Sequence, residues 1–364
     1  MKIGERFSRL LLSKTKGIGP RRFLQLLTEY NGELECLLAL SDKNLNKNLG
    51  QRIADEFISV RRRVDYDKYI NGLKSKGISL VVYGERSYPF YLSQISDYPI
   101  CLFYKGNFDY HKLYKAISVV GTRNLSQYGE NSIRWIVKDL VKSDFGIVSG
   151  LANGSDSISH LECIENKGYT LAVIPTAPNV PVPINNRYLY EKILNNQGGI
   201  VSENDDDLRE IHPKMFALRN RIIAGLTLST LIIEADIKSG ALITAENAFD
   251  NDRFVFAIPG DIFSLGSRGT NNLIKINKAK LIQSAGDVLS ELGYEKKVDI
   301  KSKYSPNNPA EEKIINLLSK AEYNSTQLST LSGLGIEHVN RTLSVLEIGG
   351  VVQRDIQGNL RIML

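Results

Sequence analysis

The chain has 364 residues, 42% of them hydrophobic and 24% charged, which predicts two or three domains with real cores and excludes a disordered chain. Its net charge of +6 favours a polyanionic partner. Three cysteines without C-x-x-C spacing speak against disulfides or a zinc site, and no apolar run is long enough to cross a membrane, so we expect a reducing cytoplasm.

Residues 1–71 are predicted to form a small all-α domain of the SAM or helix-hairpin-helix type. The glycines and proline of residues 16–21 predict a tight turn that can hold a phosphate through backbone N–H groups, although a plain helix connector has the same pattern. Apolar residues recur at helical spacing over residues 9–12, 21–30, 34–40 and 52–64. Cations are concentrated here, with Glu5 as the one acid before residue 29: Lys2, Arg6, Arg9, Lys14, Lys16, Arg21, Arg22 and, later, Arg61, Arg62 and Arg63.

Residues 72–294 are predicted to form an α/β domain. From residue 116 onward, short β-branched runs alternate with helical stretches, which is typical of a parallel sheet with crossover helices. Residues 72–115 are expected to add a strand and a cover to this sheet. The predicted parallel strands are residues 117–120, 146–148, 170–174, 200–202, 230–233, 254–258 and 280–282.

Turns rich in small residues follow nearly every one of these strands. In an open parallel sheet such turns lie at the carboxyl edge, where ligands bind at a topological switch point. Glycines there allow the backbone to approach a ligand closely, so we expect the binding site at this edge. The turns are residues 121–123, 149–154, 203–204, 234–240 and 259–260.

Residues 295–310 are polar and contain two prolines, which predicts a linker. Residues 311–364 are then predicted to form a winged helix, with helices over 312–319, 326–331 and 336–347 and a hairpin that pairs 351–354 with 360–363. Modules of this kind bind DNA through the third helix, which here carries His338, Asn340 and Arg341, but many bind proteins or only pack.

The segment 211–233 carries Lys214, Arg219 and Arg221 and no acidic residue. The two arginines stand near the start of a predicted helix, so we expect their forked donors and the helix dipole to meet one anion. A phosphate backbone is the obvious candidate, and Phe216 can stack on an unpaired base, which favours single strands. The alternative is that one arginine pairs with an acid from another segment while the other is solvated.

Candidates for catalysis are few. Asp156 and His160 lie four residues apart on a predicted helix and can touch, with serines nearby that a histidine can activate. Such a pair more often fixes a helix to a neighbouring loop. The chain also lacks a P-loop, and Gly121-Thr122-Arg123 stands where a dinucleotide site has its glycine motif, so we expect no catalytic residue, metal or cofactor.

Several motifs, in order between about residues 116 and 282, together resemble the DNA processing protein A (DprA/Smf) family. They are Val119-Val120-Gly121-Thr122-Arg123, Ser149-Gly150-Leu151-Ala152-x-Gly154-x-Asp156-x-x-x-His160, Phe216-x-x-Arg219-Asn220-Arg221-Ile222-Ile223-Ala224-Gly225-Leu226, Glu234-Ala235-x-x-x-Ser239-Gly240-Ala241-Leu242-Ile243-Thr244-Ala245, and Pro259-Gly260 with Gly269-Thr270-Asn271-x-Leu273-Ile274. The departures from the family pattern are Thr122, Ser155, Ser159 and the pair Asn277-Lys278.

The resemblance implies an extended Rossmann-like domain that binds single-stranded DNA, forms homodimers and has no turnover. It also implies that the protein protects incoming DNA and helps to load the RecA recombinase during natural transformation. The residues that it implies for strand binding are Gly121, Thr122, Arg123, Lys214, Phe216, Arg219, Asn220, Arg221, Ser239 and Gly240.

Two other functions are compatible with the sequence. Nucleotide-processing hydrolases of the lysine-decarboxylase-like Rossmann group resemble P-G-G-x-G-T with a downstream glutamate. Here Pro259-Gly260 is followed by Asp261, and Gly269-Thr270 lies far away without that carboxylate. The third possibility is a protein-interaction scaffold whose terminal domains matter most.

Overall fold

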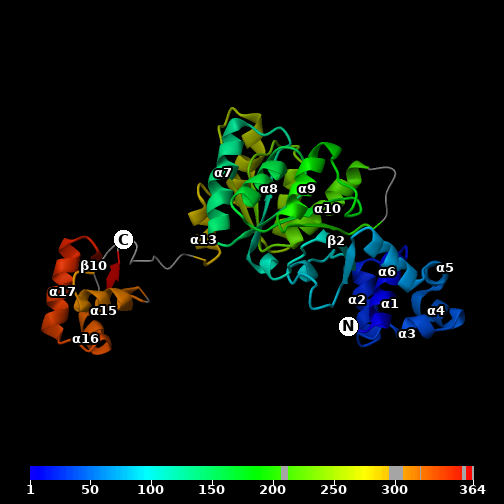
Figure 1. The fold of residues 1–364 in the computed structure, drawn as a ribbon, viewed down its shortest axis with the longest axis horizontal. Helices are drawn as coiled ribbons and strands as arrows, with labels where there is room; N and C mark the ends of the chain where they lie inside the picture. Colours follow the sequence, from blue (N-terminus) through cyan, green and yellow to red (C-terminus); the bar gives the residue numbers. More distant parts are fainter. Residues whose placement is uncertain (206–211, 295–305, 320, 355–357, 363–364) are drawn as a thin grey trace. The chain divides into compact units, whose positions relative to one another are not determined.

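The computed structural model describes residues 1–205, 212–294, 306–319, 321–354 and 358–362 (Figure 1). Two compact units are present, Met1–Asp287 and Val288–Leu364. The boundary predicted after residue 71 falls inside helix α6, and most of the predicted linker at 295–310 lies outside the described residues. None of the helices in the described ranges has the length and apolarity that a membrane span requires.

Six helices build the N-terminal part of the first unit, and they pack around buried Leu10, Phe23 and Phe57. Four of them overlap predicted helices, whereas α4 and α6 were not predicted. Both of these begin at an N-cap, because Ser41 accepts from the Asn44 amide and Asp65 from the Lys68 amide, and both carry only a short apolar stripe. The helices are α1 (Ile3–Lys14), α2 (Pro20–Glu29), α3 (Cys36–Ala39), α4 (Asp42–Leu49), α5 (Gln51–Arg63) and α6 (Tyr66–Ser75).

A nine-stranded sheet forms the centre of the first unit, in the order β1-β2-β6-β5-β4-β3-β7-β8-β9. All seven predicted parallel strands are present, and the central ones are buried along their whole length, as expected for strands covered on both faces. They are β3 (Ala116–Val120), β4 (Gly146–Ser149), β5 (Thr170–Val173), β6 (Gly199–Ser202), β7 (Ser229–Ile232), β8 (Phe254–Ala257) and β9 (Lys280–Leu281).

Residues 79–115 extend this sheet by two strands, β1 (Ser79–Val82) and β2 (Cys101–Gly106), where one was predicted. Strand β2 pairs antiparallel with β6, and β1 pairs antiparallel with β2. The chain between them packs on the end of α10, where Leu92 and Ile95 lie against Gly225. Two short 3-10 helices complete this segment, η1 (Leu92–Gln94) and η2 (Lys112–Lys115).

The crossovers place two sets of helices on opposite faces of the sheet. Strands β3 to β6 follow one another in one direction, and the chain then returns to β7 beside β3 and continues in the other direction. Because such crossovers are right-handed, the first three helices cover one face and the next three the other. The first set is α7 (Gln127–Lys142), α8 (Ser155–Glu165) and α9 (Arg187–Asn195); the second is α10 (Pro213–Gly225), α11 (Ala241–Asp250) and α12 (Arg268–Lys275).

This topology puts the switch point between β3 and β7, which pair in parallel from Ile117 to Val120. The connections of these two strands leave toward opposite faces, so a crevice opens at their carboxyl ends. The predicted turn 121–123 and the predicted turn 234–240 both lie there.

The second unit has the element order predicted for a winged helix. It contains α15 (Pro309–Leu318), α16 (Ser325–Ser332), α17 (Ile336–Ile348) and a hairpin of β10 (Val352–Arg354) with β11 (Leu360–Ile362). Its core is formed by Ile314, Leu328, Val339 and Leu343. Helix α13 (Ala285–Glu291) follows β9 and contains the division between the two units.

The turn after β3 is held tightly between two other elements. The Thr122 amide donates to the Glu234 carbonyl at 2.7 Å, and the Ser155 amide donates to the Thr122 carbonyl at 3.1 Å. Gly154 makes this approach possible, because its φ is +77° and a Cβ there would lie 2.5 Å from the carbonyl oxygens of Thr122 and Arg123.

We expect Gly154→Ala to destabilise the protein by at least about 3 kcal/mol, because it combines backbone strain with a clash against backbone. Gly32→Ala is the matched control, since its φ is also positive but nothing lies within 4 Å of its Cβ position. That variant should lose about 1 kcal/mol. Urea unfolding of both variants gives the comparison, and equal losses would contradict the close approach at Gly154.

Candidate nucleic-acid interface

A cavity of about 480 Å³ opens at the switch point. We call it the switch-point pocket. Most of its lining comes from the turn after β3, the turn after β7 with the start of α11, and helix α10, and the turn between β4 and α8 completes it. Its lining residues are Val120, Gly121, Thr122, Arg123, Ala152, Asp156, Pro213, Phe216, Ala217, Arg219, Asn220, Ile223, Asp236, Lys238, Ser239, Gly240, Ala241, Ile243 and Thr244. Eight of the ten predicted site residues are among them; Lys214 and Arg221 are not.

Arg219 lies beneath this pocket and is 6% exposed. Its guanidinium donates to the Gly150 carbonyl at 2.7 Å and to the Val173 carbonyl, which joins the carboxyl ends of β4 and β5. Burial lowers the pKa of Arg219 to about 10, opposed by Asp156 and reinforced by Arg123. The side chain stays charged at neutral pH, but its hydrogen bonds are made within the protein.

Asn220 fastens the same helix to a second segment. Its side-chain oxygen accepts from Nε of Arg219 at 3.2 Å, and its Nδ2 donates to the Gly240 carbonyl at 3.2 Å. This contact fixes the turn after β7, whose Ser239 hydroxyl accepts from the Ala241 amide. Asn220 therefore shapes the pocket wall.

Arg221 points to the opposite side of α10, because two residues turn a helix by about 200°. It pairs with Asp97 at 2.9 Å and with Glu203 at 2.7 Å, and its side chain is 11% exposed. The expectation that Arg219 and Arg221 meet one anion is therefore wrong. The alternative stated for the sequence, an arginine paired with an acid from another segment, holds for Arg221.

The cavity beside Arg221, of about 410 Å³, also receives the turn between α1 and α2 that resembles a helix-hairpin-helix turn. Asp97, Glu203 and Asp205 line it as well, and Lys14 pairs with Asp205 at 2.7 Å. Three carboxylates at this turn oppose the binding of a phosphate. The Arg61 to Arg63 cluster is also partly used internally, since Arg61 and Arg62 both pair with Asp42.

Two exposed cations line the switch-point pocket, Arg123 and Lys238, and a third, Lys214, follows the lining residue Pro213 in the first turn of α10. None of the three has an ion pair or side-chain hydrogen bond to a described residue. Lys238 was not predicted as a site residue. The sequence pointed to Lys238 only through its place in the turn after β7, two residues before Gly240.

Phe216 lies half-buried between the rim and the floor of the pocket. The guanidinium carbon of Arg123 lies 5.5 Å from its ring centroid, and that of Arg219 lies 5.9 Å from it. The ring therefore makes cation–π contacts with one exposed and one buried arginine.

Asp156 and His160 are both buried and hydrogen-bonded within the protein, as expected for a structural role. His160 is fully buried and its Nδ1 lies 2.7 Å from the Thr170 hydroxyl, and burial lowers its pKa to about 3. Asp156 accepts from the amides of Gly150 and Ala152, and burial raises its pKa while Arg219 opposes the rise. In the described part of the chain no group of three acidic, cysteine or histidine side chains is placed to hold a metal.

Comparison with known proteins decides the family. The family model described as DNA recombination-mediator protein A matches residues 79–293, which include the whole switch-point pocket. The chain belongs to this family.

Individual relatives agree with this assignment. DNA processing protein DprA of Streptococcus pneumoniae is 42% identical over 207 residues, which are 57% of this chain and 72% of the relative. An X-ray structure of DprA from Streptococcus pneumoniae has 33% identity and a TM-score of 0.67, and the match covers 80% of this chain and 99% of that one. A structure described by the unique single-stranded DNA binding mode of DNA processing protein A from Helicobacter pylori has 26% identity and a TM-score of 0.52, covering 59% and 95%.

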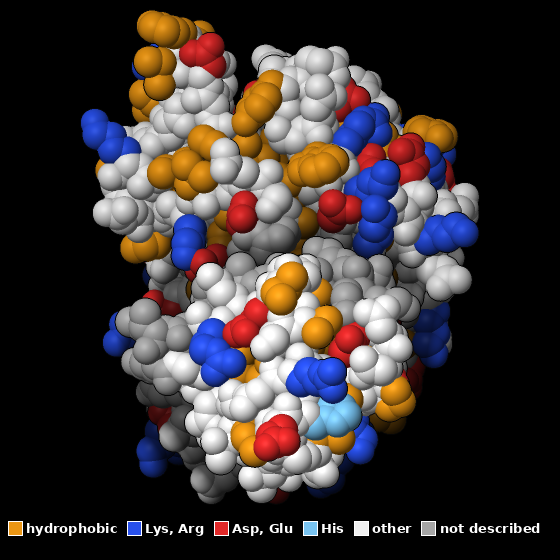
Figure 2. Space-filling model, turned by 90° about the vertical axis from the view of Figure 1, so that its left-hand side faces the viewer, with side chains coloured by type: hydrophobic (Ala, Val, Ile, Leu, Met, Phe, Trp, Pro, Cys, Tyr) orange, Lys and Arg blue, Asp and Glu red, His pale blue; other side chains and the backbone are white. Residues whose placement is uncertain are grey.

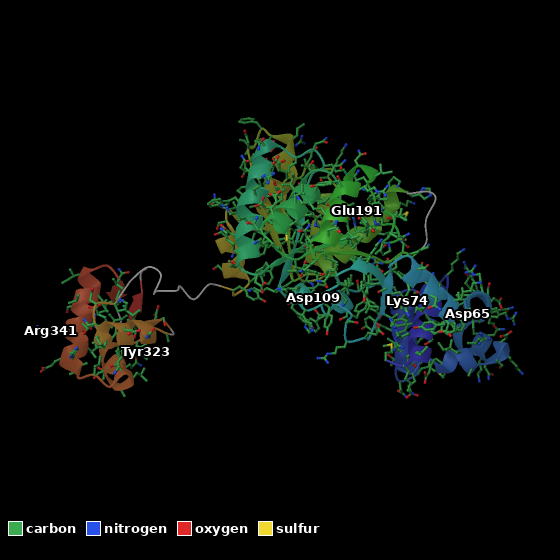
Figure 3. All side chains as sticks on the ribbon, in the orientation of Figure 1. Asp65, Lys74, Asp109, Glu191, Tyr323 and Arg341 are labelled. Carbon is green, nitrogen blue, oxygen red and sulfur yellow. The ribbon has the colours of Figure 1, made fainter. Side chains whose placement is uncertain are left out.

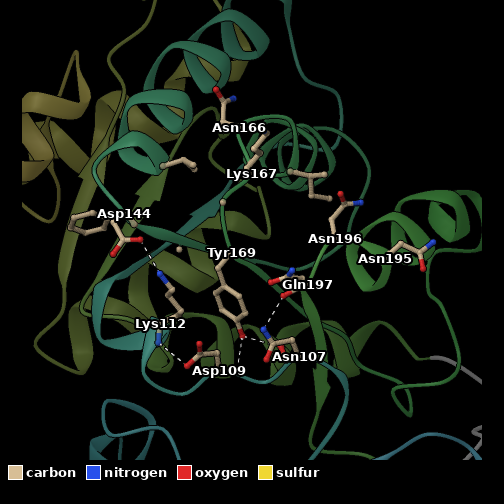
Figure 4. A pocket seen from close by; sticks show the side chains of 15 residues that line it. Asn107, Asp109, Lys112, Asp144, Asn166, Lys167, Tyr169, Asn195, Asn196 and Gln197 are labelled. Carbon is tan, nitrogen blue, oxygen red and sulfur yellow. Dashed lines mark hydrogen bonds and ion pairs between the residues drawn. The ribbon is translucent and has the colours of Figure 1, made fainter.

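A second cavity, of about 570 Å³, lies at the amino edge of β4 and β5, the edge of the sheet opposite to the switch-point pocket (Figure 4). Its charged groups are partly neutralised, since Lys112 pairs with Asp144 at 2.9 Å. Tyr169 lies in its middle and accepts from the Asp109 amide at 3.1 Å. Lys167, exposed at this edge, has no ion pair to a described residue.

The winged-helix unit has little positive charge on its third helix. His338, Asn340 and Arg341 are exposed on α17, and Figure 3 shows Arg341 on its outer side. Glu337 and Glu347 stand on the same helix, and Glu347 pairs with Arg354 at 3.2 Å. On the face seen in Figure 2, basic and acidic side chains are likewise interspersed. Reading of duplex DNA by this helix stays a prediction.

We expect Arg219→Met to cost about 3–5 kcal/mol of stability, because it leaves Asp156 buried without its cation and removes two bonds between strand ends. Arg123→Met is the matched control, and it should change stability by less than about 0.5 kcal/mol because Arg123 is exposed. Urea denaturation checks both. A native-like midpoint for Arg219→Met would contradict the fastening role of Arg219.

Proposed function

We propose that this protein binds single-stranded DNA in the switch-point pocket. The observation that carries the proposal is the pair of exposed cations that line the pocket, Arg123 and Lys238, with Lys214 beside the lining residue Pro213; none of the three has an ion pair to a described residue. Unneutralised cations around a concave site attract a phosphate backbone. The described binding of single-stranded DNA by the Helicobacter pylori relative supports the same assignment.

A single strand suits this pocket better than a duplex. Its backbone bends freely into a cavity between two turns, whereas a duplex presents its phosphates on a stiff, convex surface. Backbone contacts carry no sequence information, so binding should be indifferent to sequence.

The wider role that we propose is protection of incoming DNA and loading of the RecA recombinase during natural transformation, in the cytoplasm and without turnover. The description of the family as a recombination mediator supports this role. The three cysteines are free thiols, which fits a reducing compartment.

The hydrolase alternative has less support. The Pro259-Gly260 turn is closed by the chain itself, since Gly260 donates its amide to the Asn271 side-chain oxygen at 3.1 Å and accepts from its Nδ2 at 2.9 Å. Two carboxylates line the pocket. Asp156 is buried and bound to two backbone amides, and Asp236 accepts from the Ile237 amide at 2.8 Å and lies 3.9 Å from Nε of Arg268. These groups are already engaged within the protein.

We also propose that the protein forms homodimers. The support comes from large apolar side chains that are exposed and that no described residue covers. They lie in the loop before η4 (Leu265–Ser267) and in the segment from η4 to β9. Ile262, Phe263 and Leu265 lie within four residues of one another, and Ile276 and Leu281 follow on the same segment. Several exposed apolar side chains on one segment favour an interaction surface.

Phe263→Glu should convert the dimer to a monomer, because Phe263 is 88% exposed and a charge there would be buried unpaired on association. Light scattering after size exclusion measures the mass. Trp135→Glu is the control, since Trp135 is exposed on α7 outside this segment and should keep the native mass. A dimer that survives Phe263→Glu would move the interface elsewhere.

Lys238→Ala should weaken binding of oligothymidine and reduce the slope of log affinity against log salt by about one unit, because one phosphate contact is lost. Lys167→Ala removes the same charge at the opposite edge of the sheet and serves as the matched control.

Fluorescence anisotropy at several salt concentrations measures both quantities. Arg123→Ala should behave as Lys238→Ala does, and a duplex of equal length should bind more weakly than the single strand. Equal effects of Lys238→Ala and Lys167→Ala would mean that only net charge matters and would remove the pocket from the proposal.

A further inference from the structure

The three residues that follow strand β6 each contact a different part of the first unit. We call Glu203, Asn204 and Asp205 the β6 exit. The Glu203 carboxylate pairs with Arg221 of α10 at 2.7 Å, and Nδ2 of Asn204 donates at 2.8 Å to the carbonyl of Pro175, in the loop after β5. Asp205 contacts the N-terminal helices. The β6 exit therefore joins α10 to segments that lie far away in the sequence.

Two side chains from the N-terminal helices hold the Asp205 carboxylate. Nζ of Lys14, the last residue of α1, lies 2.7 Å from one carboxylate oxygen, and the Tyr69 hydroxyl of α6 donates to the same oxygen. The ammonium group also lies 5.1 Å from the centroid of the Tyr69 ring, so all three side chains contact one another. The Asp205 side chain is 9% exposed, and a carboxylate so far withdrawn from water needs its cation and its donor.

Helix α1 is also fixed to the edge strand of the sheet. Arg6 donates to the Leu80 carbonyl at 2.6 Å, and Arg9 donates to the Tyr83 carbonyl at 3.1 Å. The first half of α1 thus holds β1 and the residue after it, while its last residue holds the β6 exit. Because the helix is fixed at both places, it gives Asp205 a rigid support.

The β6 exit contacts α10 on the side opposite to the switch-point pocket. Arg219 lines the pocket, whereas Arg221 is held at the β6 exit by Glu203 and at the chain before β2 by Asp97. Successive turns of an α-helix are joined by backbone hydrogen bonds, so the two sides of α10 move together. A displacement of the β6 exit would therefore shift the pocket residues of α10 relative to the turns after β3 and β7.

We propose that Lys14 and Tyr69 are positioning residues for the switch-point pocket, which act through Asp205 and the β6 exit on α10. The N-terminal helices then raise the affinity for a single strand without touching it. This inference rests on the proposed binding of single-stranded DNA at the pocket. Because coupling between two sites is reciprocal, a bound strand must also stabilise the contact of Lys14 with Asp205.

The test measures binding of oligothymidine to the full-length protein by fluorescence anisotropy and compares Lys14→Met with Lys2→Met. Both variants lose one cation and one ion pair of α1, but Lys2 pairs with Glu35, inside the N-terminal helices. Lys14→Met should weaken binding by about 3-fold to 30-fold, and Lys2→Met by less than about 2-fold. The slope of log affinity against log salt should stay native in Lys14→Met, because no phosphate contact is lost.

Two milder variants test the same contact with every charge kept. Tyr69→Phe removes only the hydroxyl that donates to Asp205 and should weaken binding by about 2-fold to 5-fold. Lys14→Arg keeps a cation beside Asp205 and should bind more tightly than Lys14→Met. Urea unfolding shows whether each variant is folded at the temperature of the titration.

A double-mutant cycle follows the path through the β6 exit. In the Glu203→Gln background, Lys14→Met should have less than about a 2-fold further effect, because the link to Arg221 is already weakened. Hydrogen exchange measures the reverse direction. Saturating oligothymidine should slow exchange of the amides in the last turn of α1 in the native protein, and less so in Glu203→Gln.

Two results would overturn the positioning role. One is native affinity in both Lys14→Met and Tyr69→Phe. The other is a salt slope that falls by about one unit in Lys14→Met, since Lys14 would then be a phosphate contact. If Lys238→Ala also leaves affinity and slope unchanged, the proposed function falls; if Lys238→Ala weakens binding while the Lys14 and Tyr69 variants do not, only the positioning role falls.

Discussion

The whole pocket depends on one buried contact, that of the Arg219 guanidinium with the carbonyls of Gly150 and Val173. Buried carbonyls without donors are costly, and so is a buried cation without acceptors, so each stabilises the other. The contact brings α10 onto the ends of β4 and β5, and Asn220 and Arg221 then fix the helix to two further segments. Three consecutive polar residues thus hold α10 from three directions.

This arrangement separates residues that shape the site from residues that are free to meet a ligand. Arg219, Asn220 and Arg221 shape the site, and both guanidiniums are already bonded within the protein. The free cations come from the turns around these residues and from the first turn of α10, which are exposed because strand ends and helix starts reach the edge of the sheet. Arg123 and Lys238 belong to two different turns, so the rim forms only when β3 and β7 pair.

Much of the fold follows from sequence pattern alone. Continuous β-branched runs mark the buried parallel strands, and the turns that follow them had to share one edge, which correctly predicted that Gly121 and Gly240 line one pocket. The directions in which side chains point were harder to predict. Arg219 and Arg221 are two residues apart on a helix, so their side chains point in different directions. Arg221 forms ion pairs with Asp97 and Glu203, which come from segments that no local sequence pattern connects to it. Lys238 was missed because a lysine in a turn has no spacing rule.

The edges of the sheet have a consequence for self-association. Strand β9 consists of two residues and β1 of four, so each edge offers few unpaired backbone groups to another chain. Short edge strands limit the addition of strand upon strand that leads to aggregation. Copies that meet through the neighbouring apolar side chains must therefore recognise one another by shape, which favours a closed pair over an open-ended fibre.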